Sequence, residues 1–245
     1  MTDVTLTKIA DFQNVLANYS PSKATLNTLA SMPLGIMVGI TGAGKNTIMN
    51  QLMNIGGYYI IVSDTTRPPK VRDGRMEVDG LQYNFVSEDA FLDGLRSGDY
   101  IEAEIIHRQQ VSGANSHELE KAAKSGKIPI NEIEIKGAKR IAEYKPDTKF
   151  FFIVPPSYKE WMSRLLGREV MTEEEKAKRI STAIDELEVG LGHDEFIFVI
   201  NDSSEKSASM INEIMHGRRF DDHHDEAVAA AKEILADIKQ HHSNR

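Results

Sequence analysis

The sequence predicts a large α/β domain with a parallel β-sheet covered by helices on both faces. Two observations lead to this fold class. Short apolar runs recur along the chain, and amphipathic segments with helical spacing separate them. Strands that alternate with helices form parallel sheets with buried strands. The predicted strands are residues 34–40, 58–62, 128–135, 149–154 and 196–200.

The helices are predicted from the same alternation. Residues 47–53 follow the first strand, and 173–189 carry Ile180, Ala183, Ile184 and Leu187 at helical spacing. Residues 1–30 are typical of a helical, partly polar extension that is interrupted near 20–22. A terminal amphipathic helix ends in the polar HHSNR and is marked by Val228, Ala231, Ile234, Leu235 and Ile238.

The composition excludes several classes of function. The 245 residues include no cysteine, so a disulfide framework, a thiolate metal site and a cysteine nucleophile are impossible. The amino terminus lacks the pattern of a secretory signal, and the apolar runs fall short of the ~20 residues that span a bilayer. A net charge of -8 argues against nucleic-acid or membrane-surface binding. We expect a cytoplasmic protein of open oligomeric state whose partners are small molecules.

The stretch GITGAGKNTI, residues 39–48, predicts a phosphate-binding loop between a strand and a helix. The pattern G-x-x-x-x-G-K-[ST] is met by Gly39, Gly44 and Lys45. Glycines let backbone N–H groups converge on phosphate oxygens, and the helix N-terminus adds partial positive charge. The candidate ATP-binding residues of this loop are Gly39, Thr41, Gly42, Ala43, Gly44, Lys45, Asn46 and Thr47.

Asn46 stands where the pattern expects a hydroxyl that binds Mg²⁺. Its amide oxygen is a hard, neutral ligand, but it lies farther from the backbone than a serine oxygen. Thr47 follows directly and offers a hydroxyl. Three arrangements stay open: ligation by Asn46, ligation by Thr47, and contact through water. We expect reduced rather than absent support for the metal.

The sequence after the loop resembles the guanylate kinase family. SDTTRPPK at 63–70, GDYIEAEIIH at 98–107, NEIEIKGAK at 131–139, RLLGRE at 164–169 and VINDSSEKS at 199–207 follow in the family's order. The resemblance covers roughly residues 33–215. It implies ATP-dependent phosphorylation of GMP and dGMP with Mg²⁺, on a P-loop NTPase core. The implied parts are a domain at 31–215 between extensions at 1–30 and 216–245, a small mostly-β monophosphate-binding insert at about 64–127, and a lid at about 164–190.

The resemblance also implies the site residues. Phosphoryl transfer needs two aligned polyanions and cationic groups rather than a general base. The implied catalytic residues are Lys45, Arg67, Arg168 and Arg179, and the implied ATP-binding residues beyond the loop are Arg164, Arg168 and Asn201. The implied GMP-binding residues are Ser63, Arg67, Lys70, Tyr83, Glu102, Ser112 and Glu134. Carboxylates suit guanine, because its N1–H and 2-amino group are adjacent donors.

The chain departs from the family pattern at several of these positions. Lys70 replaces an arginine and Glu134 an aspartate, and QVSGANS at 110–116 puts Ser112 in place of a tyrosine and Ala114 in place of a hydroxyl residue. The loop after Asp64 is longer than in the family and supplies Arg72 and Arg75, which either share the duty of Lys70 or face solvent. The changes at Ser112, Ala114 and Glu134 bear on guanine recognition rather than on the type of reaction.

Two other functions remain open. In the first, the chain is a kinase whose acceptor is a different nucleoside monophosphate or a sugar phosphate. In the second, the chain is a non-catalytic binding module. The histidines of DDHHDE, 221–226, lack the spacing of a metal site, so this segment is predicted to be a solvated acidic linker. Trp161 is predicted to pack beside the lid hinge, and His107, His117 and His193 are assigned no role.

Overall fold

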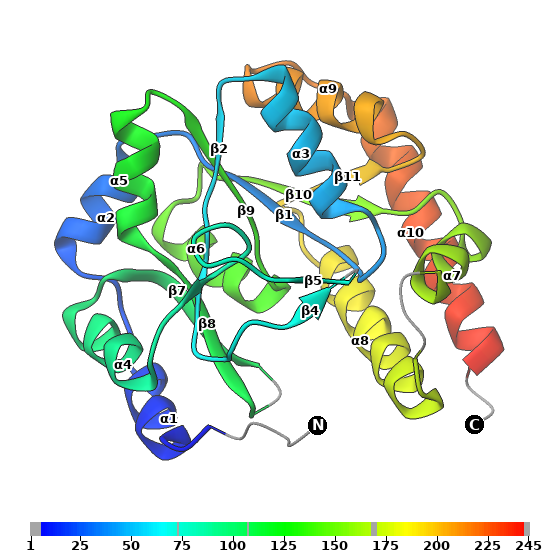
Figure 1. Ribbon diagram of the computed structural model, residues 1–245. Coiled ribbons are helices and arrows are strands. Elements are labelled where there is room, and N and C mark those ends of the chain that lie inside the picture. Colours follow the sequence, from blue (N-terminus) through cyan, green and yellow to red (C-terminus); the bar gives the residue numbers. More distant parts are fainter. Residues whose placement is uncertain (1–5, 73, 107, 168–170, 243–245) are drawn as a thin grey trace. The chain divides into compact units, whose positions relative to one another are not determined.

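The computed structural model describes residues 6–72, 74–106, 108–167 and 171–242, which form two compact units (Figure 1). Unit 1 draws on Met1–Leu34, Tyr59–Pro129 and Lys139–Asp147, and unit 2 draws on Gly35–Tyr58, Ile130–Ala138 and Thr148–Arg245. Both units are therefore assembled from segments that are far apart in the sequence. Among the described residues, no helix combines the length and the apolar character needed to cross a bilayer.

Unit 2 is built on a parallel sheet. Strand β1 (Gly35–Val38) pairs in parallel with β9 (Ile128–Glu132) and β10 (Lys149–Val154), and β10 pairs with β11 (Phe196–Ile200). The chain passes from unit 2 to unit 1 in β2 (Tyr58–Ile60), and the strand order is β11-β10-β1-β9-β2. Strands buried on both faces form runs of mostly non-polar residues, and all four residues of β1 are buried and non-polar. The predicted sheet is confirmed.

Helices flank this sheet. Helix α3 (Lys45–Ile55) packs against α9 (Ser204–Met215), and α10 (Asp221–His242) packs against β11 and α8 (Glu173–Leu191). Helix α7 (Tyr158–Leu166) follows β10. Ser157, Thr172 and Ser203 each accept a backbone N–H at the start of their helices, which caps α7, α8 and α9.

The prediction for residues 221–226 is wrong, because they begin helix α10 rather than a solvated linker. Strand β11 lies at the edge of the sheet, where backbone N–H groups lack a strand partner. His224 Nδ1 accepts the N–H of Phe198 at 3.1 Å, and His223 Nε2 accepts that of Ile200 at 3.3 Å. The histidine pair therefore covers the edge of β11.

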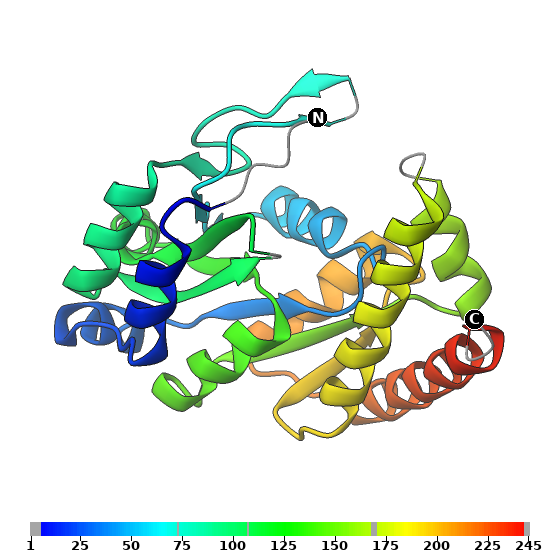
Figure 2. The same ribbon diagram turned by 90° about the horizontal axis from the view of Figure 1, so that it is seen from below.

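Unit 1 contains a mixed sheet with helices, in which β3 pairs in parallel with β6 and antiparallel with β8, and β8 pairs antiparallel with β7. The strand order is β6-β3-β8-β7. Its strands are β3 (Asp64–Thr65), β6 (Asn84–Phe85), β7 (Tyr100–Ile106) and β8 (Gln110–Asn115). Its helices are α1 (Ile9–Ala17), α2 (Lys23–Ala30), α4 (Glu88–Ser97), α5 (Ser116–Lys124) and the later part of α6 (Ile135–Tyr144). The hairpin of β4 (Val71–Arg72) and β5 (Arg75–Met76), drawn in cyan, projects from unit 1 in Figure 2.

The amino-terminal helices belong to the core of unit 1. Phe12 of α1 meets Phe91 of α4 edge to face, with ring centroids 6.0 Å apart. Phe91 in turn stacks on Tyr100 at 4.2 Å. Burial of aromatic rings contributes strongly to core stability. The predicted helical extension is present, and its apolar face covers α4 and β7.

Candidate functional site

The turn between β1 and α3 has the backbone of a phosphate-binding loop. Gly39 has φ +124°, and a Cβ there would lie 2.4 Å from the carbonyl oxygen of Ile153. Gly44 has φ +95°, and a Cβ there would lie 2.2 Å from Asn201 Nδ2. Side chains at either position would be strained and would displace these neighbours. The two motif glycines are thus required by the geometry of this chain.

Lys45 begins helix α3 and is buried. Its ammonium group donates to the carbonyl oxygens of Gly39 and Ile40 and lies 3.3 Å from Glu132 Oε1. Three acceptors therefore stabilise a positive charge inside the loop. Such a charge beside a helix N-terminus favours a bound anion.

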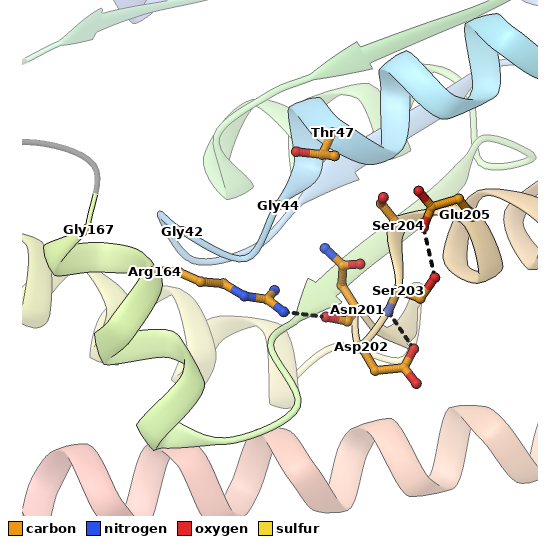
Figure 3. Close-up of a pocket in the computed structure, with 10 residues that line it drawn as sticks. All are labelled: Gly42, Gly44, Thr47, Arg164, Gly167, Asn201, Asp202, Ser203, Ser204 and Glu205. Atoms are coloured by element: carbon orange, nitrogen blue, oxygen red, sulfur yellow. Dashed lines mark hydrogen bonds between the residues drawn. The ribbon is translucent and has the colours of Figure 1, made fainter. Parts of the chain in front are cut away.

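A pocket of about 610 Å³ opens next to the loop (Figure 3). Arg164 of α7 lies on one side of it, and its Nη2 donates to the carbonyl oxygen of Asn201 at 3.1 Å. Thr47, at the start of α3, lies on another side. The lining residues are Gly42, Gly44, Thr47, Arg164, Gly167, Asn201, Asp202, Ser203, Ser204 and Glu205. The run 202–205 was not predicted, because strand-end polar residues are ordinary turn formers in a sequence.

Two side chains hold the loop to its surroundings. Asn201 Nδ2 donates to the carbonyl oxygen of Ala43 at 2.7 Å. Trp161 is fully buried, and its indole N–H donates to the carbonyl oxygen of Thr41 at 2.8 Å. Trp161 is therefore a core residue that also restrains the loop, a role that its sequence position does not reveal.

Of the two predicted lid arginines Arg168 and Arg179, the structure describes only Arg179. Arg179 lies on α8, and its Nη2 is 2.6 Å from Glu175 Oε1, one helical turn earlier. It is not among the residues that line the pocket. Arg168 lies outside the described residues.

Unit 2 also contains a group of carboxylates near Lys45. Burial raises the pKa of Glu186, on α8, to about 7, and nearby Glu134 and Glu132 raise it further against the lowering effect of Lys45. Glu186 Oε2 is buried and makes no hydrogen bond within the described chain. Glu134 itself is exposed. Helical spacing alone does not distinguish Glu186 from the solvated glutamates of α8, so sequence reasoning missed it.

In unit 1, Arg67 is held by Glu77. Arg67 Nη1 and Nη2 lie 2.5 and 2.9 Å from the two carboxylate oxygens of Glu77, and the guanidinium carbon is 4.8 Å from the centre of the Tyr83 ring. The backbone N–H of Lys70 donates to the same carboxylate. The side chains of Lys70 and Arg75 are exposed, and that of Arg72 is outside the described structure. The Asp-Gly pair at 73–74 is a hairpin signal that could have placed Glu77 opposite residue 70.

The remaining predicted residues of unit 1 lie on β7, β8 and beside β3. Glu102 is buried, and its Oε1 accepts the N–H of Ala114 at 3.2 Å. Ser112 Oγ lies 2.9 Å from Thr65 Oγ1. Ser63 is half-buried, immediately before β3. Glu102 thus belongs to unit 1, whereas Glu134 belongs to unit 2.

The comparison with protein families settles which family this chain is part of. The family described as guanylate kinase matches residues 31–218. The chain belongs to the guanylate kinase family. The guanylate kinase of Corynebacterium diphtheriae is 35% identical over 188 residues, which are 76% of this chain and 95% of that protein. The guanylate kinase of Helicobacter pylori is 36% identical over 177 residues, 72% of this chain and 82% of that protein.

The fold agrees with this membership. The crystal structure of guanylate kinase from Anaplasma phagocytophilum matches with a TM-score of 0.55 at 21% sequence identity, covering 88% of this chain and 97% of that one. The guanylate kinase match begins after α1 and α2 and ends before α10. These three helices are therefore additions to the part that the family shares.

The loop of this guanylate kinase family member suits a magnesium ion. Asn46 and Thr47 are both exposed in the first turn of α3, and Thr47 lines the pocket. Mg²⁺ prefers hard oxygen ligands and keeps several of its waters. An amide oxygen and a hydroxyl beside Gly44 meet that requirement, so the donor set fits the ion.

Proposed function

We propose that the chain catalyses the ATP-dependent phosphorylation of GMP and dGMP to their diphosphates. The observation that carries this proposal is the buried Lys45 at the start of α3, in a loop where a side chain at Gly39 or Gly44 would clash with its neighbours. Membership of the guanylate kinase family supports the acceptor. The attacking phosphate oxygen is already anionic, so the site needs alignment and charge neutralisation and no general base. The absence of cysteine fits a cytoplasmic enzyme.

The donor nucleotide would bind in the pocket beside the phosphate loop. Backbone N–H groups of residues 39–47 would hold its phosphates at the N-terminus of α3. Phosphate oxygens would replace the carbonyl oxygens of Gly39 and Ile40 as partners of Lys45. Arg164 lines the pocket and would contact the same phosphates, while Asn201, which donates to Ala43, would lie beside the adenosine.

Arginines of the lid would neutralise charge on the transferring phosphoryl group. We assign this role to Arg179 and Arg168. Arg179 carries a partner, Glu175, on its own helix, and a half-exposed pair of this kind exchanges readily for a phosphate. Mg²⁺, held by Asn46 or Thr47 or through water, would supply further neutralisation of the phosphate charge when bound.

The acceptor phosphate would bind to Arg67. Three of its five N–H groups donate to Glu77 and Pro68 within the described chain, which leaves two for a phosphate. Glu77 thereby fixes the plane of the guanidinium. Ser63, Lys70 and Tyr83 would complete the phosphate site. Lys70 offers a point charge rather than a fork, so we expect it to orient the phosphate less strictly than an arginine would.

Glu102, Glu134 and Ser112 would read the base. The buried Glu102 accepts a hydrogen bond from Ala114, and its carboxylate would accept from the N1–H and 2-amino donors of guanine when the nucleotide binds. Adenine has an acceptor at N1, which a carboxylate repels. A wrong base would leave the buried carboxylate without hydrogen-bond donors, so the binding of that base would be strongly disfavoured.

One observation favours a second candidate, a kinase with a different acceptor. The hydroxyl of Ser112 is engaged with Thr65, and Ala114 has no hydroxyl, so fewer groups of β8 are free to contact a base. Another nucleoside monophosphate or a sugar phosphate is then the acceptor. A non-catalytic binding module fits less well, because Lys45 is held inside a formed loop and Arg164 lines the pocket beside it.

The test is ADP release from ATP and Mg²⁺ with GMP, dGMP, AMP, CMP, UMP, dTMP and ribose phosphates as acceptors. We expect turnover with GMP and dGMP alone, and its loss in Lys45→Ala. Turnover confined to another acceptor would show that the chain is a kinase for that acceptor instead. No turnover with any acceptor, together with unchanged melting on addition of ATP, would favour the binding module.

A further inference from the structure

We propose that Tyr19, between α1 and α2, is a positioning residue that orients Glu102 through the backbone of Tyr100 and so sets the affinity for the acceptor nucleotide. This inference rests on the proposed function, because the acceptor is the GMP assigned above. Residues 6–30 lie before the part of the chain that matches the family, so this role belongs to the added segment.

The hydroxyl of Tyr19 forms hydrogen bonds with both the C=O and the N–H group of Tyr100. It donates to the carbonyl oxygen of Tyr100 at 2.5 Å and accepts the N–H of Tyr100 at 2.9 Å. Strand β7 is the edge strand of the sheet in unit 1, so these groups have no strand partner on that side among the described residues. Burial raises the pKa of Tyr19, so its hydroxyl stays protonated and able to donate. Tyr19 thus takes the place of a neighbouring strand at a single residue.

This contact lies at an irregular point of the β7–β8 ladder. Tyr100 pairs with Asn115 and Glu102 pairs with Ala114, so Ile101 is an extra residue in β7. Such a bulge bends its strand and changes the direction of the side chains that follow. Glu102 is the first residue after the bulge. Because Tyr19 holds Tyr100, it fixes the strand on the side from which the bulge starts.

The side chain of Tyr100 extends the same restraint to β3. Its hydroxyl donates to Asp64 Oδ2 at 2.7 Å, and Asp64 also accepts from Asn84 and Asn115. The ring packs directly against two glycines, since a Cβ on Gly94 would lie 2.8 Å from it and one on Gly113 would lie 3.0 Å from it. Asp64 adjoins Ser63, so the network borders the proposed phosphate site as well as Glu102.

A second contact anchors the added segment nearby. The carbonyl oxygen of Gly98 accepts the N–H of Ser22 at 2.9 Å and the hydroxyl of Thr25 at 2.8 Å. Loss of the Thr25 hydroxyl leaves Gly98 with the Ser22 bond, whereas loss of the Tyr19 hydroxyl removes the shared partner of both Tyr100 groups. Thr25→Val is therefore a matched control, because it weakens the docking of the segment without releasing the bulge.

The experiment compares the wild-type chain, Tyr19→Phe and Thr25→Val by calorimetric titration with GMP, IMP and ATP. IMP lacks the 2-amino group and so reports on the carboxylate that reads it. In Tyr19→Phe we expect the dissociation constant for GMP to rise about five- to tenfold, as when a buried group loses its hydrogen bond. The preference for GMP over IMP should shrink, and ATP binding should stay within about twofold. Thr25→Val should retain all three affinities.

Two results would overturn the inference. One is an unchanged affinity and an unchanged preference for GMP over IMP in Tyr19→Phe. The other is an equal loss of GMP and ATP affinity, or an equal effect of Thr25→Val, because a merely structural role weakens all ligands alike. The wild-type titration separates this from failure of the proposed function: a wild-type chain that binds ATP but not GMP lacks the proposed acceptor, and the role of Tyr19 falls with it.

Discussion

Arg67 and Glu77 form a buried, two-point salt bridge in unit 1, with side chains that are 6% and 1% exposed. The pair comes from two sides of the hairpin β4–β5, where the N–H of Glu77 also donates to the carbonyl oxygen of Lys70 at 2.9 Å. A guanidinium held in this way presents its remaining N–H groups in one direction. The orientation of the proposed phosphate ligand thus depends on a carboxylate ten residues later in the chain.

Glu77→Gln should therefore impair both stability and acceptor binding. Removing one partner of a buried ion pair leaves an uncompensated charge and costs about 3–5 kcal/mol of unfolding free energy. We expect that loss in urea denaturation, with an increased KM for GMP. Arg96→Gln is the control, because it breaks an exposed pair with Asp93 on α4 and should cost less than about 1 kcal/mol. Equal effects of the two variants would contradict the prediction.

Asn46→Ser should strengthen support for the metal. A serine hydroxyl lies closer to the backbone than the amide oxygen of asparagine and needs less adjustment of the loop to reach Mg²⁺. We expect turnover at lower Mg²⁺ concentrations, measured by titrating the ion at saturating ATP and GMP. Asn50→Ser, one turn later on the exposed side of α3, should leave the titration unchanged. An unaltered titration for Asn46→Ser would show that residue 46 does not bind the metal.

Trp161→Phe should weaken the donor site selectively. Phenylalanine keeps an aromatic ring in the core but loses the N–H that donates to Thr41. An unsatisfied carbonyl group in the loop costs about 1–3 kcal/mol, so we expect the KM for ATP to rise while the KM for GMP stays near its wild-type value. Tyr158→Phe, on the same helix, loses a hydrogen bond to His242 and should change neither constant. A parallel rise of both KM values in Trp161→Phe would argue against a specific role in the loop.

Glu186→Gln should make stability less dependent on pH. The pKa of Glu186 is raised from 4.5 to about 7, chiefly by burial, so the folded protein binds this proton more tightly than the unfolded chain. Its contribution to stability is present below pH 4.5 and is lost as the pH rises towards about 7. Glutamine mimics the protonated form. We expect Glu186→Gln to raise the melting temperature at pH 8 and to change it little at pH 4.5.

The control for that experiment is Glu174→Gln, which alters an exposed glutamate in the first turn of the same helix. It should not produce a gain in stability that grows with pH. A pH-independent effect of Glu186→Gln would mean that the carboxyl group is solvated in the folded protein.

The parallel sheet and the phosphate loop could be predicted from the sequence because both depend on local patterns. Apolar runs are required wherever a strand is buried on both faces, and Gly39, Gly44 and Lys45 have a spacing set by the loop itself. The segment 221–226 was predicted wrongly, because its acidic residues are typical of solvated linkers. Its histidines instead meet the edge of β11, a contact over about two dozen residues that composition does not encode.

The sequence by itself determined the type of sheet, the phosphate loop, the candidate cationic site residues and the likeness to guanylate kinases. Each of these depends on residues that are close together along the chain. Only the tertiary structure decided which partner each candidate has. Arg67 meets Glu77, Tyr19 meets Tyr100, and Trp161 meets Thr41, each through a hydrogen bond between segments brought together by folding. Such pairings depend on burial and on the register of strands and helices, so they follow from how the whole chain packs rather than from any one motif.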